Sequence, residues 1–123
     1  MTEVIDCGGL DDLDADDLAR LPPGVRLAVY AYSTYDWGGC GDLLLVMEDG
    51  RLLWQDLGHC SCYGPAGLGA PWADLRETTP AELSARLSRH ASDYDPEASS
   101  VGQEIAECSF KMLARLRELG VVP

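Results

Sequence analysis

The segment GHCSCYGP, from Gly58 to Pro65, gathers three side chains that bind metals or carry out thiol chemistry. These are His59, Cys60 and Cys62. Imidazole and thiolate groups are ligands that Zn²⁺ prefers, and a thiolate is also a nucleophile where its surroundings lower the thiol pKa. The segment is therefore compatible with a zinc site, with a reactive thiol, or with a glycine-bordered turn that buries small sulfur side chains.

Catalysis is the enzymatic alternative for the loop His59-Cys60-Ser61-Cys62. Cys60 or Cys62 would be the nucleophile, with His59 lowering a thiol pKa and Asp36 or Asp56 as an orienting acid. Neighbours in an extended chain point to opposite faces, however, so His59 is better placed to reach a residue across a hairpin than Cys60 beside it. A water activated by an incomplete zinc site is a second form of this alternative.

A β-hairpin precedes the loop and would position it. Residues 25–34 (VRLAVYAYST) are rich in β-branched and aromatic side chains and predict a strand, with alternate side chains on opposite faces. Residues 42–57 (DLLLVMEDGRLLWQDL) predict a hairpin in which Asp49-Gly50 is a two-residue turn. The cysteine loop would then lie at the open end of this hairpin.

The two-residue turn also predicts the register. It pairs Leu45 with Trp54, and extended outward it sets Cys40 opposite His59. Residues directly opposite one another have Cβ atoms about 5 Å apart, which is close enough to share a metal ion. The predicted zinc ligands are Cys40, His59, Cys60 and Cys62, with Cys7, Asp36 or His90 as further candidates to complete the site.

Two helices are predicted in the C-terminal part of the chain. Thr79 and Glu82 form a capping box that begins a helix over about 80–90. A longer helix spans about 101–119 and ends at Gly120. Its predicted buried stripe consists of Val101, Ile105, Cys108, Met112, Leu116 and Leu119.

These elements predict an α+β fold in a single domain, residues 1–123. A small antiparallel sheet of three to four strands, which includes the hairpin and takes residues 3–6 as an edge strand, is packed by the two C-terminal helices. A short N-terminal helix is predicted over about 15–21, and residues 64–78 are predicted as irregular coil. Cys7 and Cys108 are expected to be packing residues.

The charge of the chain restricts its partners. The net charge is −12, from 21 acidic and nine basic residues, and seven of the acidic residues lie within the first 17. Such a field repels phosphate backbones, so DNA and RNA are disfavoured as partners. The acidic N-terminal stretch is either a solvated face or a surface that docks on a basic partner or mimics nucleic acid.

Composition also bears on the compartment. No apolar run approaches the about 18 residues that cross a bilayer, and the N-terminal residues lack the pattern of a secretory signal. We therefore expect a cytoplasmic protein that is not inserted in a membrane. Its five cysteines are then expected to be free thiols or metal ligands rather than a disulfide framework.

Aromatic residues near the same end of the sheet are candidates for partner binding, because amphipathic rings are enriched in recognition surfaces. Trp54 is expected in the core. The predicted partner-binding residues are Tyr35, Trp37, Tyr63 and Trp72, with Trp37 and Trp72 as exposed anchors.

The block DGRLLWQDLGHCSCYGP, from Asp49 to Pro65, resembles small uncharacterised proteins of actinobacteria and their phages, which have a hairpin followed by an H-C-S-C-Y block. The resemblance covers about residues 35–65 and implies a phage or mobile-element context without an activity. With the acidic charge, it favours a small binding protein, such as a phage accessory protein or an immunity-type inhibitor, that acts on a protein partner. The alternative is a cysteine- or zinc-dependent enzyme.

Overall fold

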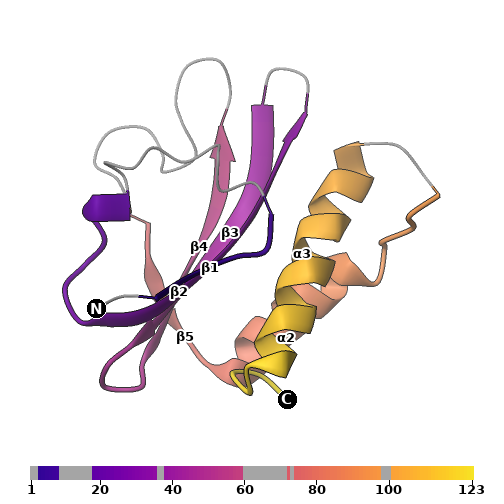
Figure 1. Ribbon diagram of the computed structural model, residues 1–123. Helices are drawn as coiled ribbons and strands as arrows, with labels where there is room; N and C mark the ends of the chain where they lie inside the picture. The colour runs from indigo at the N-terminus through magenta and orange to yellow at the C-terminus, as the bar shows by residue number, and fades with distance from the viewer. Residues whose placement is uncertain (1–2, 9–17, 36–37, 60–71, 73, 98–100) are drawn as a thin grey trace.

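A computed structural model of the chain describes residues 3–8, 18–35, 38–59, 72, 74–97 and 101–123. Within these ranges the side chains at 34–35, 38, 58–59, 101–102 and 104–105 are not described. The fold is α+β, as predicted: a sheet forms one layer, and helices α2 (Pro80–Ala91) and α3 (Val101–Glu118) cover one of its faces (Figure 1).

The sheet has five strands in sequential order, β1 (Glu3–Asp6), β2 (Val25–Tyr35), β3 (Gly38–Met47), β4 (Leu52–His59) and β5 (Arg76–Thr78). The edge strand β1 was predicted, but it pairs with β2 in parallel, so the sheet is mixed rather than antiparallel. Parallel neighbours require a crossover connection. Half of that connection, residues 9–17, lies outside the described residues, and with it residues 15–17 of the helix predicted over 15–21. In the described part of that predicted helix, residues 18 and 19 are helical.

The fifth strand corrects the prediction of irregular coil over 64–78. Its three residues pair antiparallel with the start of β4, so that Thr78 lies opposite Leu52 and Arg76 opposite Trp54. Three residues are too few to show a strand period in the sequence. The strand forms because β4 offers a free edge immediately before the cap of α2.

The hairpin register differs from the prediction by one residue. Leu44, not Leu45, lies opposite Trp54, and Cys40 lies opposite Gly58 instead of His59. The turn has three residues rather than two: the Met47 amide bonds to the Arg51 carbonyl at 2.9 Å. Gly50 closes the turn with φ of +92°, which is the left-handed position of a type I turn followed by a bulge.

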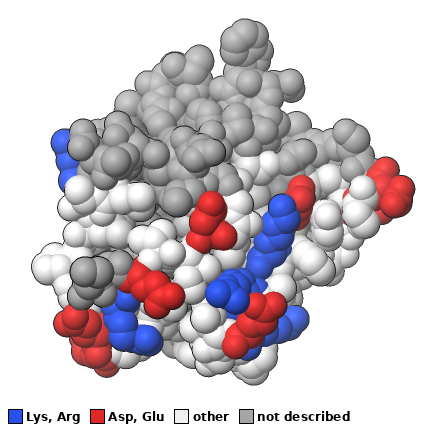
Figure 2. Space-filling model, in the orientation of Figure 1, with Lys and Arg blue, Asp and Glu red and all other residues white. Residues whose placement is uncertain are grey.

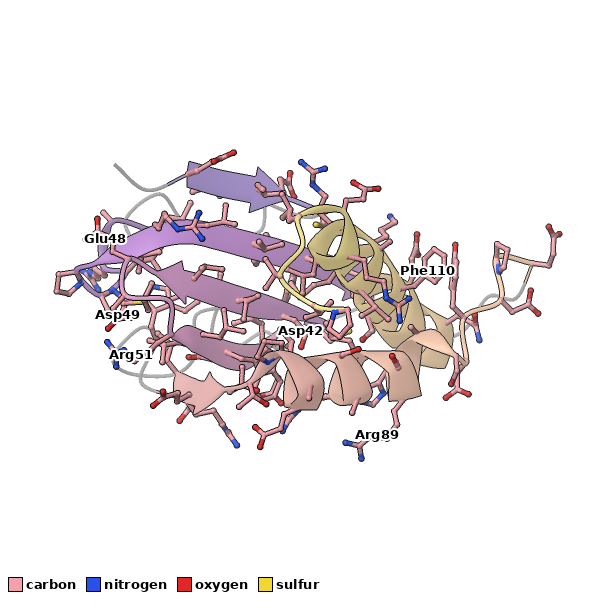
Figure 3. The ribbon with its side chains drawn as sticks, turned by 90° about the horizontal axis from the view of Figure 1, so that it is seen from below. Asp42, Glu48, Asp49, Arg51, Arg89 and Phe110 are labelled. Atoms are coloured by element: carbon pink, nitrogen blue, oxygen red, sulfur yellow. The ribbon has the colours of Figure 1, made fainter. Side chains whose placement is uncertain are left out.

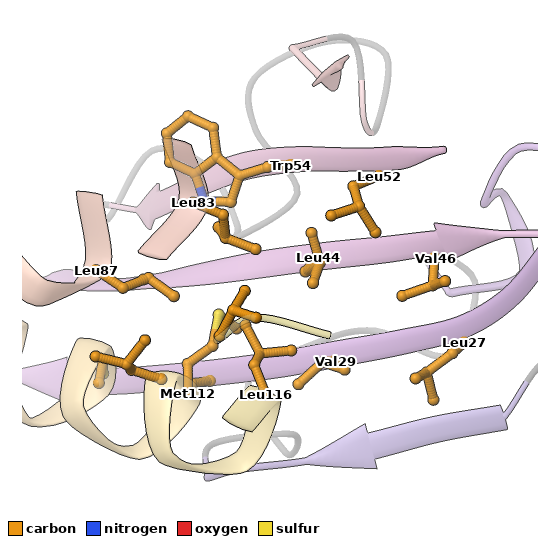
Figure 4. Packing of buried hydrophobic residues seen from close by; sticks show 14 residues of the cluster. Leu27, Val29, Leu44, Val46, Leu52, Trp54, Leu83, Leu87, Met112 and Leu116 are labelled. Atoms are coloured by element: carbon orange, nitrogen blue, oxygen red, sulfur yellow. The ribbon is translucent and has the colours of Figure 1, made fainter. Parts of the chain in front are cut away.

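Both faces of the sheet are buried. The helix-facing core joins strand residues such as Val29, Leu44 and Trp54 to Leu83 of α2 and Met112 of α3 (Figure 4). The opposite face carries Tyr30, Tyr32, Leu43, Leu45, Leu57 and Trp72. The predicted alternation along β2 is confirmed from Leu27 onward, whereas a bulge between Val25 and Leu27 turns Val25 to the opposite face.

The helix termini follow local sequence signals. The Thr79 hydroxyl accepts a 3.2 Å hydrogen bond from the Glu82 amide, which confirms the predicted cap of α2. At the end of α3, Gly120 has φ of +73°, and the Val121 amide bonds to the Leu116 carbonyl at 3.0 Å, as in a Schellman motif.

The buried stripe of α3 agrees with the prediction at Cys108, Met112 and Leu116, and additionally includes Leu113. Leu119 was predicted to be buried but is 37 % exposed, because it lies beyond the last residue of the helix. Neither described helix is both long and apolar enough to cross a membrane.

Candidate functional site

A cleft opens between the sheet and the two helices, where β3 begins and β4 ends. Its volume is about 480 Å³, and its walls come from β3, β4, α2 and α3. Clefts of this size are usual sites for ligands in proteins. Most of the residues that line this one are polar, and its apolar surface comes from Gly41, Trp54, Leu57 and Leu87. The polar side chains that line it are Cys40, Asp42, Asp56, Arg86, Arg89, His90, Cys108 and Ser109.

Asp42 is the buried acid of this cleft and lies between the sheet and the helices (Figure 3). Alternation along β3 places it on the same side as Leu44 and Val46, which face the helices. Burial disfavours the carboxylate and raises its pKa to about 6. The Trp54 indole N–H donates a hydrogen bond of 3.1 Å to Oδ1, which favours the carboxylate without offsetting the loss of hydration.

Trp54 is fixed by cations as well as by Asp42. The Arg86 guanidinium lies 3.9 Å from the centre of the indole ring, and that of Arg76 lies 5.5 Å from it. Both distances are within the range of a cation–π interaction. Arg86 therefore stacks on the ring of Trp54, and the described residues contain no ion pair between Arg86 and Asp42.

Other charges at the cleft act on Asp42 more weakly. Asp56 lies directly opposite Asp42 in the β3–β4 pair, and its charge raises the pKa of Asp42 further. His90 and Arg86 on α2 lower that pKa. Like charges on directly paired residues cost stability, so the two carboxylates are better explained by a binding or chemical role than by folding.

The thiol of Cys108 lies beside Cys40. The Cys108 Sγ donates a long hydrogen bond of 3.7 Å to the Cys40 carbonyl oxygen. A hydrogen bond with the Cys40 side chain, together with burial, raises the pKa of Cys108 strongly. Burial likewise raises the pKa of Cys7. Cys7 and Cys108 are therefore protonated at neutral pH and have the character of packing residues, as predicted.

The predicted zinc ligands are only partly within the described residues. Cys60 and Cys62 lie outside them, and of His59 only the backbone is described. The register sets His59 opposite Gly39, so the predicted Cys40–His59 pair is wrong. The described residues include no cluster of three or more potential metal ligands. Zinc binding by this loop therefore stays a prediction.

Of the four predicted aromatic partner-binding residues, only Trp72 has a described side chain. Trp72 is 5 % exposed and packs on the sheet face opposite the helices, so it is a core residue and not an exposed anchor. Trp37 and Tyr63 lie outside the described residues. Tyr35 is the last residue of β2, and its side chain is not described.

The sequence pattern gave little sign of the Asp42 cleft. The one local signal is an aspartate immediately before the apolar run Leu43–Met47. Whether Asp42 meets Trp54 depends on the register of the hairpin, and the one-residue difference decides it. Comparison of the chain with protein-family models, curated proteins and solved structures gave no match.

Proposed function

We propose that this chain is a non-enzymatic, cytoplasmic binding protein, and that the Asp42 cleft receives a cationic side chain of a basic protein partner. The observation that carries the proposal is the state of the Asp42 carboxyl. It is buried at a cleft of about 480 Å³, and Trp54 is the one hydrogen-bond donor that the described residues supply to it. A phage accessory protein or an immunity-type inhibitor would act in this way.

The physical reason is the cost of burying a carboxylate without an ion pair. None of the three ion pairs among the described residues involves Asp42. A guanidinium or ammonium group from a partner would offset the lost hydration and would also find aromatic and apolar surface at Trp54 and Leu87. An uncharged group would offset much less of the hydration that the Asp42 carboxylate loses on burial.

Long-range charge favours the same class of partner. The net charge of −12 attracts basic proteins and accelerates their association, while it disfavours nucleic acids. Acidic and basic side chains are interspersed on the face that Figure 2 displays. The selectivity for a cation at this site is therefore assigned to Asp42 and the overall field, not to a uniformly acidic patch.

The test uses N-acetyl-arginine amide as a probe for a partner's arginine, with N-acetyl-citrulline amide as its neutral isostere. The readout is the NMR shift of the Trp54 indole N–H, which bonds to Asp42. We expect a weak but saturable shift with the arginine probe and a much smaller one with citrulline. The shift should be lost in Asp42→Asn.

Glu48→Gln is the matched control, because Glu48 is an exposed acid at the hairpin turn, far along the sheet from Asp42 (Figure 3). This control should retain the response to the arginine probe. Equal shifts with the two probes, or a response that persists in Asp42→Asn, would overturn the proposal.

Acid–base catalysis is the second candidate function, and the pKa of Asp42, about 6, is the observation that favours it. The enzyme predicted from the loop His59-Cys60-Ser61-Cys62 also remains a proposal, and that loop is outside the described side chains. Alkylation by iodoacetamide at pH 6 tests the loop enzyme, because it reports whether a loop cysteine is a reactive thiolate. A nucleophilic loop thiol of low pKa would react, whereas a buried or zinc-bound thiol would resist.

A further inference from the structure

Two cysteines from distant parts of the chain meet at the wall of the Asp42 cleft. Cys40 is in β3 and Cys108 is in α3, 68 residues apart. The Cys108 sulfur lies 3.7 Å from the carbonyl oxygen of Cys40, and both residues line the cleft. The sulfur of one residue thus lies against the backbone of the other, and we expect rotation of the side chains to suffice to bring the sulfurs into bonding geometry.

The two thiols differ in access. Cys108 is 5 % exposed, whereas Cys40 is half-buried and lies near the open end of β3. A small reagent in the cleft therefore reaches Cys40 first. Cys108 needs no access of its own, because its reaction partner is the sulfur of Cys40.

We propose that Cys40 and Cys108 form a reversible disulfide when the chain meets a low-molecular-weight disulfide such as oxidised glutathione. The bond links β3 to α3 across the inner wall of the cleft. It adds an oxidation site to the protein, takes Cys40 as a free thiol rather than as a zinc ligand, and does not depend on the proposed binding function.

The reaction proceeds in two thiol–disulfide exchanges. The Cys40 thiolate attacks one sulfur of oxidised glutathione, forms a mixed disulfide and releases one glutathione. The Cys108 thiol then loses its proton as its sulfur attacks the Cys40 sulfur, and the second glutathione leaves as a thiolate that takes up a proton. The protein gives up two electrons and two protons, and oxidised glutathione takes them up to become two reduced molecules.

The order of the steps agrees with the surroundings of Cys108. Cys108 is 5 % exposed, so a dissolved disulfide does not reach its sulfur, and Cys108 is a poor first nucleophile. Formation of the mixed disulfide at Cys40 brings a reactive disulfide sulfur to the buried thiol of Cys108. The second step is then intramolecular and is favoured by proximity.

Trypsin separates the relevant cysteines, which allows the disulfide to be assigned in the unaltered chain. Cleavage after Arg and Lys places Cys40 in peptide 27–51, Cys108 in 90–111, Cys60 and Cys62 together in 52–76, and Cys7 in 1–20. The folded protein is treated with oxidised glutathione, its remaining thiols are blocked with N-ethylmaleimide, and the peptides are analysed by mass spectrometry without reduction.

The expected result is a species in which 27–51 is joined to 90–111, with the loss of two hydrogen atoms from the intact chain. Addition of dithiothreitol should separate the two peptides again. Recovery of 27–51 and 90–111 as separate blocked peptides, or attachment of 27–51 to 52–76, would overturn the proposal.

Two variants give an independent check. Cys108→Ser should retain glutathione on Cys40 as a stable mixed disulfide, because the thiol that resolves it is absent. Cys7→Ser is the matched control, since Cys7 is also partly buried but does not line the Asp42 cleft, and it should form the Cys40–Cys108 link as the unaltered chain does. Failure of Cys108→Ser to accumulate the mixed disulfide would contradict the assigned order of steps.

Discussion

Replacement of Asp42 by asparagine should make the protein more stable at neutral pH, with an effect that disappears in acid. Asparagine removes the buried charge but keeps an oxygen that can accept the hydrogen bond from Trp54. The buried carboxyl has a pKa of about 6, against an ordinary value of 3.8. The folded state therefore binds this proton more tightly than the unfolded chain does.

The sign and size of the effect follow from proton linkage. Between about pH 4 and pH 6 the folded state holds more protons, so the free energy of unfolding falls as the pH rises through this interval. A shift from 3.8 to about 6, at about 1.4 kcal/mol per pH unit, corresponds to about 3 kcal/mol above pH 6. Asp42→Asn should gain up to about this amount over the unaltered protein between pH 4 and pH 7.5.

Urea unfolding across this pH range provides the assay, and the quantity compared is the change with pH in the difference between variant and unaltered protein. Any constant offset from the amide side chain then cancels. Glu48→Gln controls for the removal of one exposed carboxylate. Parallel stability curves for Asp42→Asn and the unaltered chain, or a gap that narrows as the pH rises, would refute the assignment of Asp42 as a buried, destabilised acid.

Three further outcomes are expected. Protein purified without chelator should contain about one zinc ion per chain, lost in Cys60→Ser and Cys62→Ser; normal folding without metal would refute the zinc site. Trp72→Ala should destabilise the fold by about 3–5 kcal/mol in urea unfolding, whereas an exposed anchor would change stability little. Gly41→Ala should lower stability by about 3 kcal/mol, because the added Cβ would lie 2.0 Å from the Ala31 carbonyl oxygen; an unchanged melting temperature would contradict this packing.

Local sequence signals were sufficient to predict the two C-terminal helices and most of the strands. The cap of α2 requires only Thr79 and the amide of Glu82, and the end of α3 requires only a glycine that accepts positive φ. These interactions span a few residues, so the same chemistry operates wherever the segment lies. The apolar alternation of β2 is equally local and is confirmed from Leu27 to Tyr32.

The hairpin register could not be fixed in this way. Asp49-Gly50 fits a two-residue turn as well as the last two positions of a three-residue turn. The choice between the two turns moves the pairing of β3 with β4 by one residue. Such a shift moves the side chains of one strand to the opposite face of the sheet relative to those of its partner. Packing of Leu44 and Trp54 against Leu83 and Met112 favours the three-residue turn, and this packing is a property of the whole fold.

The sequence by itself determined the α+β composition, the helix ends, the strands of the hairpin and the acidic field, because each depends on neighbouring residues or on simple totals. Only the tertiary structure decided that Asp42 lies beside Trp54, that Cys108 reaches Cys40, and that Trp72 is buried. Those contacts join strands and helices far apart in the chain. Their geometry is fixed by register and layer packing, and no local pattern of residue types carries that information.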